Sequence, residues 1–169
     1  MSYLGVNTLS IHDLVDLELA ADRAVSATGE SVYDATIAKE SAENAIKIAV
    51  AVKGVTKDVA AISIKKAEEY AEEADSAMKA AKESAKEVDA ELEVAMKFAE
   101  EFIKKSAEEA TRIATEKVAA VMNGAKQAAA VMESAMEVAK EVAKEADTAV
   151  KDAKKVFADI KSSEIATKQ

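Results

Sequence analysis

The stretch AVMNGAKQAAAVM, residues 120–132, decides the fold, because it places Asn123-Gly124 inside a run of strong helix-forming residues. Asn and Gly are the residues that best tolerate the left-handed backbone conformation in which many helices end. If the helix continues through them, it runs from about residue 56 to about residue 161 and is about 160 Å long. We expect the chain to turn back at Asn123-Gly124, and a straight helix is the alternative.

Apolar residues on both sides of this stretch keep one heptad phase, which favours the straight helix. They are Val118, Val121, Ala125, Ala128, Met132, Ala135, Ala139, Val142, Ala146, Ala149, Ala153, Val156 and Ile160. A third apolar position joins each heptad after residue 118, at Met122, Ala129, Met136, Ala143, Val150 and Phe157. A stripe of this width is typical of a helix that contacts several neighbours in a bundle. It therefore favours a turn, followed by a final helix over 125–161.

An earlier heptad seam precedes this region. Its residues are Ala67, Ala71, Ala74, Met78, Ala81, Ala85, Val88, Leu92, Ala95, Ala99 and Phe102. Its phase then slips, because Ser106 stands where an apolar residue is due. Ser106 and Glu109 also match a capping box, which marks helix starts. We expect one long helix over 56–122, with a break near 104–106 as the alternative.

Two shorter helices are predicted before residue 56. Ser10 with Asp13, and Ser31 with Asp34, match the capping box. Thr28-Gly29 provides a stop between them. A second stop is Gly54, followed by Thr56 as an N-cap. The helices are therefore expected near 10–28 and 31–53.

The composition predicts an all-α protein. Of 169 residues, 50% are hydrophobic and 33% charged, with no Pro, Cys or Trp. Ala, Glu and Lys dominate and have high helix propensity, and the heptad rhythm is typical of long helices or coiled coils. We expect a single domain over residues 1–169, built as an elongated antiparallel helical bundle or Ala-rich coiled coil of about four helices.

The charge argues against nucleic acid as a partner. The net charge is −9, and the first 34 residues hold six acidic side chains and one Arg. An acidic surface repels the phosphate backbone. The most apolar window, residues 45–52, is too short to cross a bilayer, which needs about 20 apolar residues. The start of the chain also lacks the pattern of an ordinary signal peptide, so we expect a cytoplasmic protein without a transmembrane segment.

The sequence offers little for chemistry. His12 is the single histidine, and with Asp16 it provides at most two metal ligands on one helical face. Di-iron bundles need Glu-x-x-His motifs from two helices, and Leu9 stands three residues before His12. Paired acids such as Glu72-Glu73 lie on the polar heptad face, whereas acid/base catalysis needs carboxylates in a pocket. We predict no enzyme and no catalytic, cofactor or metal site.

The remaining functions depend on helical surfaces. The leading hypothesis is a structural or protein-interaction bundle whose partner is another helical protein or a second copy of this chain, in a homo-oligomer such as a dimer. A partner helix is expected along 67–92 if the long helix does not break near Ser106. The alternative is an amphipathic protein that associates with lipid or another interface, although its polar face is acidic rather than rich in Lys and Arg. A carboxylate metal-binding bundle is a third, weaker hypothesis.

Overall fold

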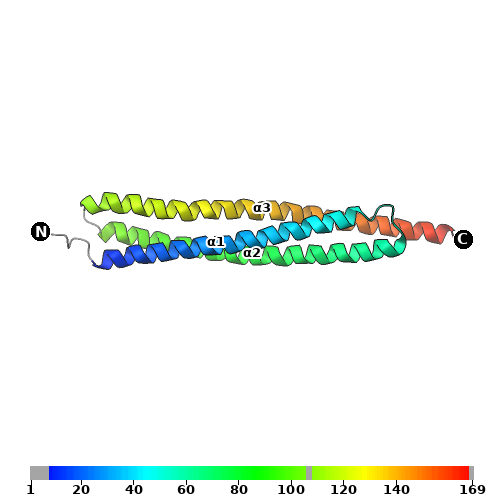
Figure 1. Ribbon diagram of the computed structural model, residues 1–169, viewed down its shortest axis with the longest axis horizontal. Helices are drawn as coiled ribbons and strands as arrows, with labels where there is room; N and C mark the ends of the chain where they lie inside the picture. The colour runs from blue at the N-terminus through cyan, green and yellow to red at the C-terminus, as the bar shows by residue number, and fades with distance from the viewer. Residues whose placement is uncertain (1–7, 106–107, 168–169) are drawn as a thin grey trace. The chain divides into compact units, whose positions relative to one another are not determined.

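The structure is a computed structural model that describes residues 8–105 and 108–167, and all regular structure in these ranges is α-helical. Helix α1 spans Thr8–Val50, α2 spans Lys57–Lys105 and α3 spans Glu108–Thr167 (Figure 1). The all-α prediction is confirmed. The prediction of about four helices is wrong, because the described residues form three longer ones.

The helices contribute to two compact units, and each unit takes a segment from all three. The first unit consists of residues 1–32 and 82–134, and the second unit of residues 33–81 and 135–169. Within each unit the α2 segment runs opposite to the segments of α1 and α3 (Figure 1). Each unit is therefore a three-helix bundle in which α1 and α3 are parallel.

The first reversal of the chain lies in the second unit, between α1 and α2. Among the glycines that the structure describes, Gly54 alone has a positive φ, at 83°. The amide of Ala60 donates a 2.8 Å hydrogen bond to the carbonyl oxygen of Thr56, directly before α2. The predicted stop at Gly54 and the N-cap position of Thr56 are confirmed. Val52, in the connection, is fully buried, which ties the reversal to the core.

The second reversal separates α2, which ends at Lys105, from α3, which begins at Glu108. The alternative of a break near 104–106 is confirmed, and the expected helix over 56–122 is wrong. The physical reason is the slip in heptad phase, since two separate helices can each set their own phase. Ser106, the predicted cap, lies outside the described residues.

The predicted turn at Asn123-Gly124 is also wrong, because α3 passes through both residues without interruption. The apolar stripe on either side explains this outcome. Met122, Ala125 and Met132 are all buried, and a turn at Gly124 would remove one side of the stripe from the core. Burial spread over many turns outweighs the cost of one helical glycine, which is about 1 kcal/mol.

The predicted stop at Thr28-Gly29 is wrong for a similar reason, since α1 is continuous there. The buried Thr28 hydroxyl donates a 2.8 Å hydrogen bond to the carbonyl oxygen of Ala24, one turn earlier. That bond satisfies the hydroxyl inside the helix. Ser31, predicted as an N-cap, is fully buried as a small residue of the core. Helix α1 begins at Thr8, two residues before the predicted cap at Ser10.

The core combines the predicted seam residues of α2 and α3 with buried residues of α1, for which no seam was predicted. In the first unit, the buried cluster contains Leu17, Ala20, Ala95, Ala99, Phe102, Val118 and Met122. The second unit has three clusters, represented by Val52, Ile64 and Val150, by Met78 and Ala139, and by Ala74 and Ala146. Every residue of both predicted seams is buried or half-buried. The heptad pattern therefore predicted which side chains of α2 and α3 lie in the core, but not those of α1.

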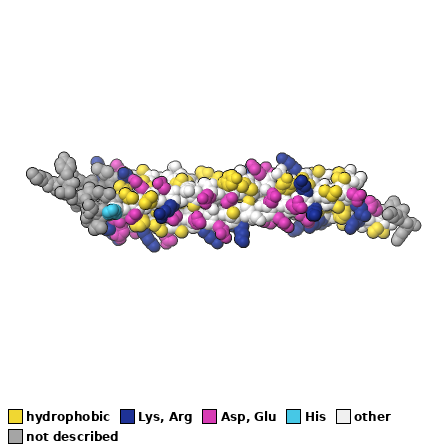
Figure 2. Space-filling model, turned by 60° about the horizontal axis from the view of Figure 1, so that its bottom comes forward, with side chains coloured by type: hydrophobic (Ala, Val, Ile, Leu, Met, Phe, Trp, Pro, Cys, Tyr) yellow, Lys and Arg dark blue, Asp and Glu magenta, His cyan; other side chains and the backbone are white. Residues whose placement is uncertain are grey.

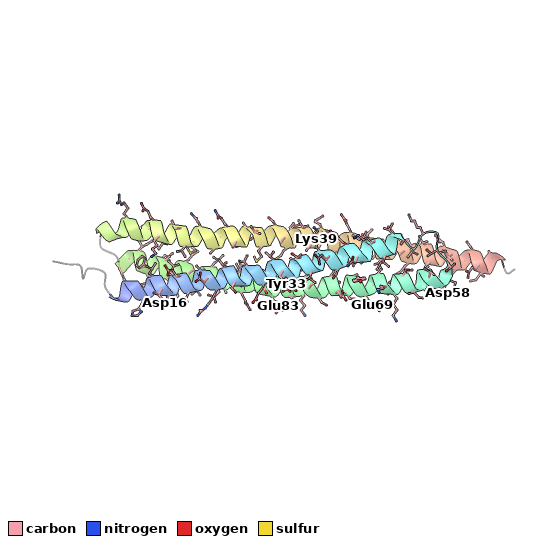
Figure 3. The ribbon with its side chains drawn as sticks, in the orientation of Figure 1. Asp16, Tyr33, Lys39, Asp58, Glu69 and Glu83 are labelled. Carbon is pink, nitrogen blue, oxygen red and sulfur yellow. The ribbon has the colours of Figure 1, made fainter. Side chains whose placement is uncertain are left out.

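The seam of α2 is covered by the protein's own helices. Ala67, Ala81 and Val88 are each 0% exposed. Charged residues between them, such as Glu69 and Glu83, are exposed on the outer side of α2 (Figure 3). The expectation that a partner helix covers residues 67–92 depended on an unbroken third helix, and it fails with that helix.

We expect substitution by Ala to have opposite effects on stability at Gly54 and at Gly124. Gly54→Ala is expected to lower the free energy of unfolding by about 1–2 kcal/mol, because a Cβ strains the left-handed conformation. Gly124→Ala is expected to raise it by about 1 kcal/mol, since an added Cβ meets nothing within 4 Å and Ala favours the helix. Urea titration followed by circular dichroism measures both, and a change of equal sign in the two variants would contradict the assignment.

Candidate functional site

The sequence predicted no catalytic, cofactor or metal site, and the few candidate residues lie apart on the surface. His12 is exposed and Asp16 is half-buried on the same face of α1. In the described part of the chain, no group of three or more His, Asp or Glu side chains is placed to hold a metal ion. The paired acids Glu72-Glu73 are exposed on α2.

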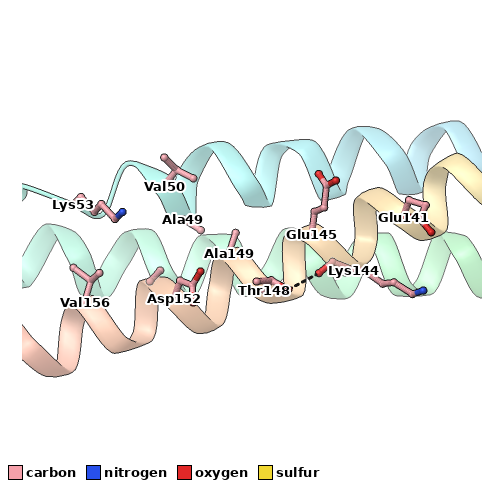
Figure 4. Close-up of a pocket in the computed structure, with 11 residues that line it drawn as sticks. Ala49, Val50, Lys53, Glu141, Lys144, Glu145, Thr148, Ala149, Asp152 and Val156 are labelled. Carbon is pink, nitrogen blue, oxygen red and sulfur yellow. Dashed lines mark hydrogen bonds between the residues drawn. The ribbon is translucent and has the colours of Figure 1, made fainter.

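Two shallow grooves lie between α1 and α3, one in each unit. The groove of the second unit has an apolar floor formed by Ala49, Ala149, Ala153 and Val156 (Figure 4). Its rim carries both signs of charge, from Lys53 and Lys144 and from Glu141, Glu145 and Asp152. The hydroxyl of Thr148 donates a 3.1 Å hydrogen bond to the carbonyl oxygen of Lys144, so this polar group is already satisfied.

The groove of the first unit has a different rim. It is lined on α1 by Glu18, Ala21, Asp22 and Val25, and on α3 by Ala120, Val121, Gly124 and Ala125. All lining residues of α3 are small or apolar, whereas α1 contributes two carboxylates. This groove therefore combines an apolar wall with a negative rim.

Ion pairs join α1 to the other two helices of the first unit. Lys105 Nζ on α2 donates a 2.9 Å hydrogen bond to Asp13 Oδ2, and Lys117 Nζ on α3 lies 3.7 Å from Glu18 Oε1. The hydrogen bond to Asp13 is the main reason that the pKa of Lys105 lies above its usual value, with Glu101 adding to it. The stabilisation from this pair is present below the usual lysine pKa and is lost as the pH rises through the higher pKa of the folded state.

Charge is distributed unevenly between the units. The first unit holds 16 acidic and 9 basic side chains, a net charge of −7, whereas the second holds 16 and 14, a net charge of −2. On the face drawn in Figure 2, acidic and basic side chains alternate with hydrophobic ones. The protein's acidity is therefore mainly a property of the first unit.

The first unit also exposes large apolar side chains on α1. Val15, Leu19 and Val25 are 46%, 47% and 45% exposed. On α3, the stretch 118–134 contains only Lys126 and Glu133 as charged residues, and Val131 within it is 61% exposed. Sequence reasoning missed this surface, although the scarcity of charge over 118–134 is a signal that could have identified it.

Each unit is thus an Ala-rich three-helix bundle with a groove between its two parallel helices, α1 and α3. No protein-family model, curated protein or solved structure matches this chain. None of the described helices contains a segment that is long and apolar enough to cross a membrane.

Proposed function

We propose that the protein is a non-enzymatic structural or protein-interaction bundle, which acts by binding another helix on its helical surface. The observation that supports this most lies in the first unit, where α1 exposes Val15, Leu19 and Val25 and the stretch 118–134 of α3 holds only two charged residues. Val15, Leu19 and Val25 are not part of the buried core. Their exposed side chains are therefore available to a partner. A cytoplasmic location is part of the proposal.

Charge depletion at the centre of a patch, rather than high hydrophobicity overall, is what distinguishes protein interfaces from other surface. The stretch 118–134 fits this description, because its exposed residues include Ala120, Asn123 and Gln127 beside one Lys and one Glu. By contrast, the exposed faces of α2 in the same unit alternate Lys and Glu, as at Lys82 and Glu83. The interaction is therefore assigned to the α1 and α3 side.

Association with a lipid surface is the competing function. Amphipathic helices that bind membranes carry Lys and Arg on the polar face, where they attract anionic lipids. The first unit, which exposes the apolar side chains, has a net charge of −7 and is repelled by such lipids. We therefore place lipid association second and a carboxylate metal site third.

Two measurements test the proposed function. In co-sedimentation at low salt with phosphatidylglycerol vesicles, we expect the protein to stay in the supernatant, and pelleting with the vesicles would support the lipid function instead. In fluorescence anisotropy, amphipathic helical peptides of positive, zero and negative net charge are titrated with the protein, while light scattering measures self-association. We expect the protein to bind at least one of the peptides or to associate with itself. A monomer that binds none of the peptides would overturn the proposed function.

A further inference from the structure

We propose that the groove between α1 and α3 in the first unit binds a cationic amphipathic helix of another protein. This inference rests on the proposed function and specifies its site and the chemistry of its partner. The groove is bounded by Val25 and Ala21 on one side and by Val121 and Gly124 on the other. Leu or Val side chains of a docked helix fit this apolar wall, since the burial of apolar surface favours association.

The two carboxylates of the groove favour a partner with positive charge. Glu18 Oε1 is 3.7 Å from Lys117 Nζ, so the negative charge of Glu18 is partly compensated. Asp22 is exposed and makes no ion pair with any residue that the structure describes. A Lys or Arg next to the apolar positions of a docked helix lies beside Asp22 and is attracted by its carboxylate.

The net charge of the first unit argues against a second copy as the occupant. Two copies that dock through this groove bring two units of net charge −7 together. Like charges across an interface oppose association, whereas a cationic partner is attracted and its encounter is accelerated. The groove of the second unit lacks this preference, because Lys53 and Lys144 compensate much of its acidic rim.

Gly124 gives the groove its open wall. A Cβ added at this residue meets no atom within 4 Å, so no contact within the described chain requires a glycine. A helical residue without a side chain lets the backbone of a second helix approach more closely. The same open space supplies a blocking substitution: Gly124→Leu fills the groove, and the gain in helix propensity keeps the fold stable.

The experiment uses a fluorescent 21-residue peptide with Leu at the heptad core positions and Lys elsewhere, and a second peptide with Glu in place of Lys. We expect the wild-type protein to bind the Lys peptide and not the Glu peptide. Gly124→Leu and Asp22→Lys are each expected to weaken binding of the Lys peptide by about tenfold or more. Circular dichroism and thermal unfolding verify that both variants are folded.

Matched controls on α2 of the same unit separate a specific site from general attraction. Ala90→Leu adds the same side chain at an exposed residue outside the groove, and Asp89→Lys makes the same charge change. Both controls are expected to bind the Lys peptide as the wild type does. If the groove variants and the controls lose the same binding of the Lys peptide, or neither loses any, the groove is not the binding site. Binding of a helix, the proposed function, would then still stand. A self-association that Gly124→Leu abolishes would show that a second copy is the occupant, and would also overturn the proposal.

Discussion

Replacing Leu17 with Ala is expected to lower the free energy of unfolding by about 2–5 kcal/mol. Leu17 is 0% exposed and belongs to the buried cluster of the first unit, together with Phe102 and Met122. Ala20, Ala95 and Ala99 of the same cluster cannot extend into the cavity that the lost side chain leaves. Urea titration followed by circular dichroism measures the change.

The control for this prediction is Leu19→Ala, two residues further along α1. Leu19 is 47% exposed, so its loss is expected to change the free energy of unfolding by only about 0.5 kcal/mol or less. Equal destabilisation by the two substitutions would mean that the face of α1 assigned to the core is wrong.

Ala139→Leu and Ala146→Leu are each expected to destabilise the protein by about 1–3 kcal/mol, because there is no room for the larger side chain. Ala139 is 0% exposed and Ala146 is 1% exposed, each in a buried cluster of the second unit. Small residues at these places let the helix axes approach closely, so a Leu forces the helices apart.

The matched controls are Lys140→Leu and Glu141→Leu, on the exposed side of the same helix. Both are expected to leave the midpoint of urea unfolding nearly unchanged. If they destabilise the protein as much as Ala139→Leu does, the heptad seam of α3 is misplaced.

The sequence was a good guide to the core because helix packing needs apolar residues at regular spacing. The seams through Val88 and Ala139 predicted burial residue by residue, and the slip in phase before Ser106 coincides with the boundary between α2 and α3. Continuous phase across Gly124 likewise coincides with a continuous helix. Heptad phase was therefore the reliable signal for where this chain turns.

Local residue preferences were less reliable. Thr28-Gly29 and Asn123-Gly124 both suggested helix ends, yet α1 and α3 continue through them, and only Gly54 adopts a left-handed conformation among the described glycines. A preference of about 1 kcal/mol at one residue is small beside the burial of several side chains on each side.

The grooves could not be predicted from the sequence, because they depend on which helices are neighbours. Glu18 and Gly124 line one groove although about a hundred residues separate them. The heptad pattern shows which faces of α2 and α3 are buried, but it does not show that α1 lies parallel to α3. The acidity of the first 34 residues is visible in the sequence, and the proposal of a cationic partner depends on it.

The continuity of α3 through Gly124 is the central claim, since both the three-helix topology and the proposed groove depend on it. The chain has no Cys, so spin labels attach only at the two introduced cysteines of a Glu116→Cys, Ser134→Cys variant. Double electron–electron resonance measures a long distance between them, and dipolar broadening of the continuous-wave spectrum reports a short one. The two positions are 18 residues apart in the sequence, so an unbroken helix predicts a separation of about 27 Å. A turn at Asn123-Gly124 places both labels on neighbouring antiparallel helices, and a separation of about 10 Å would contradict the topology.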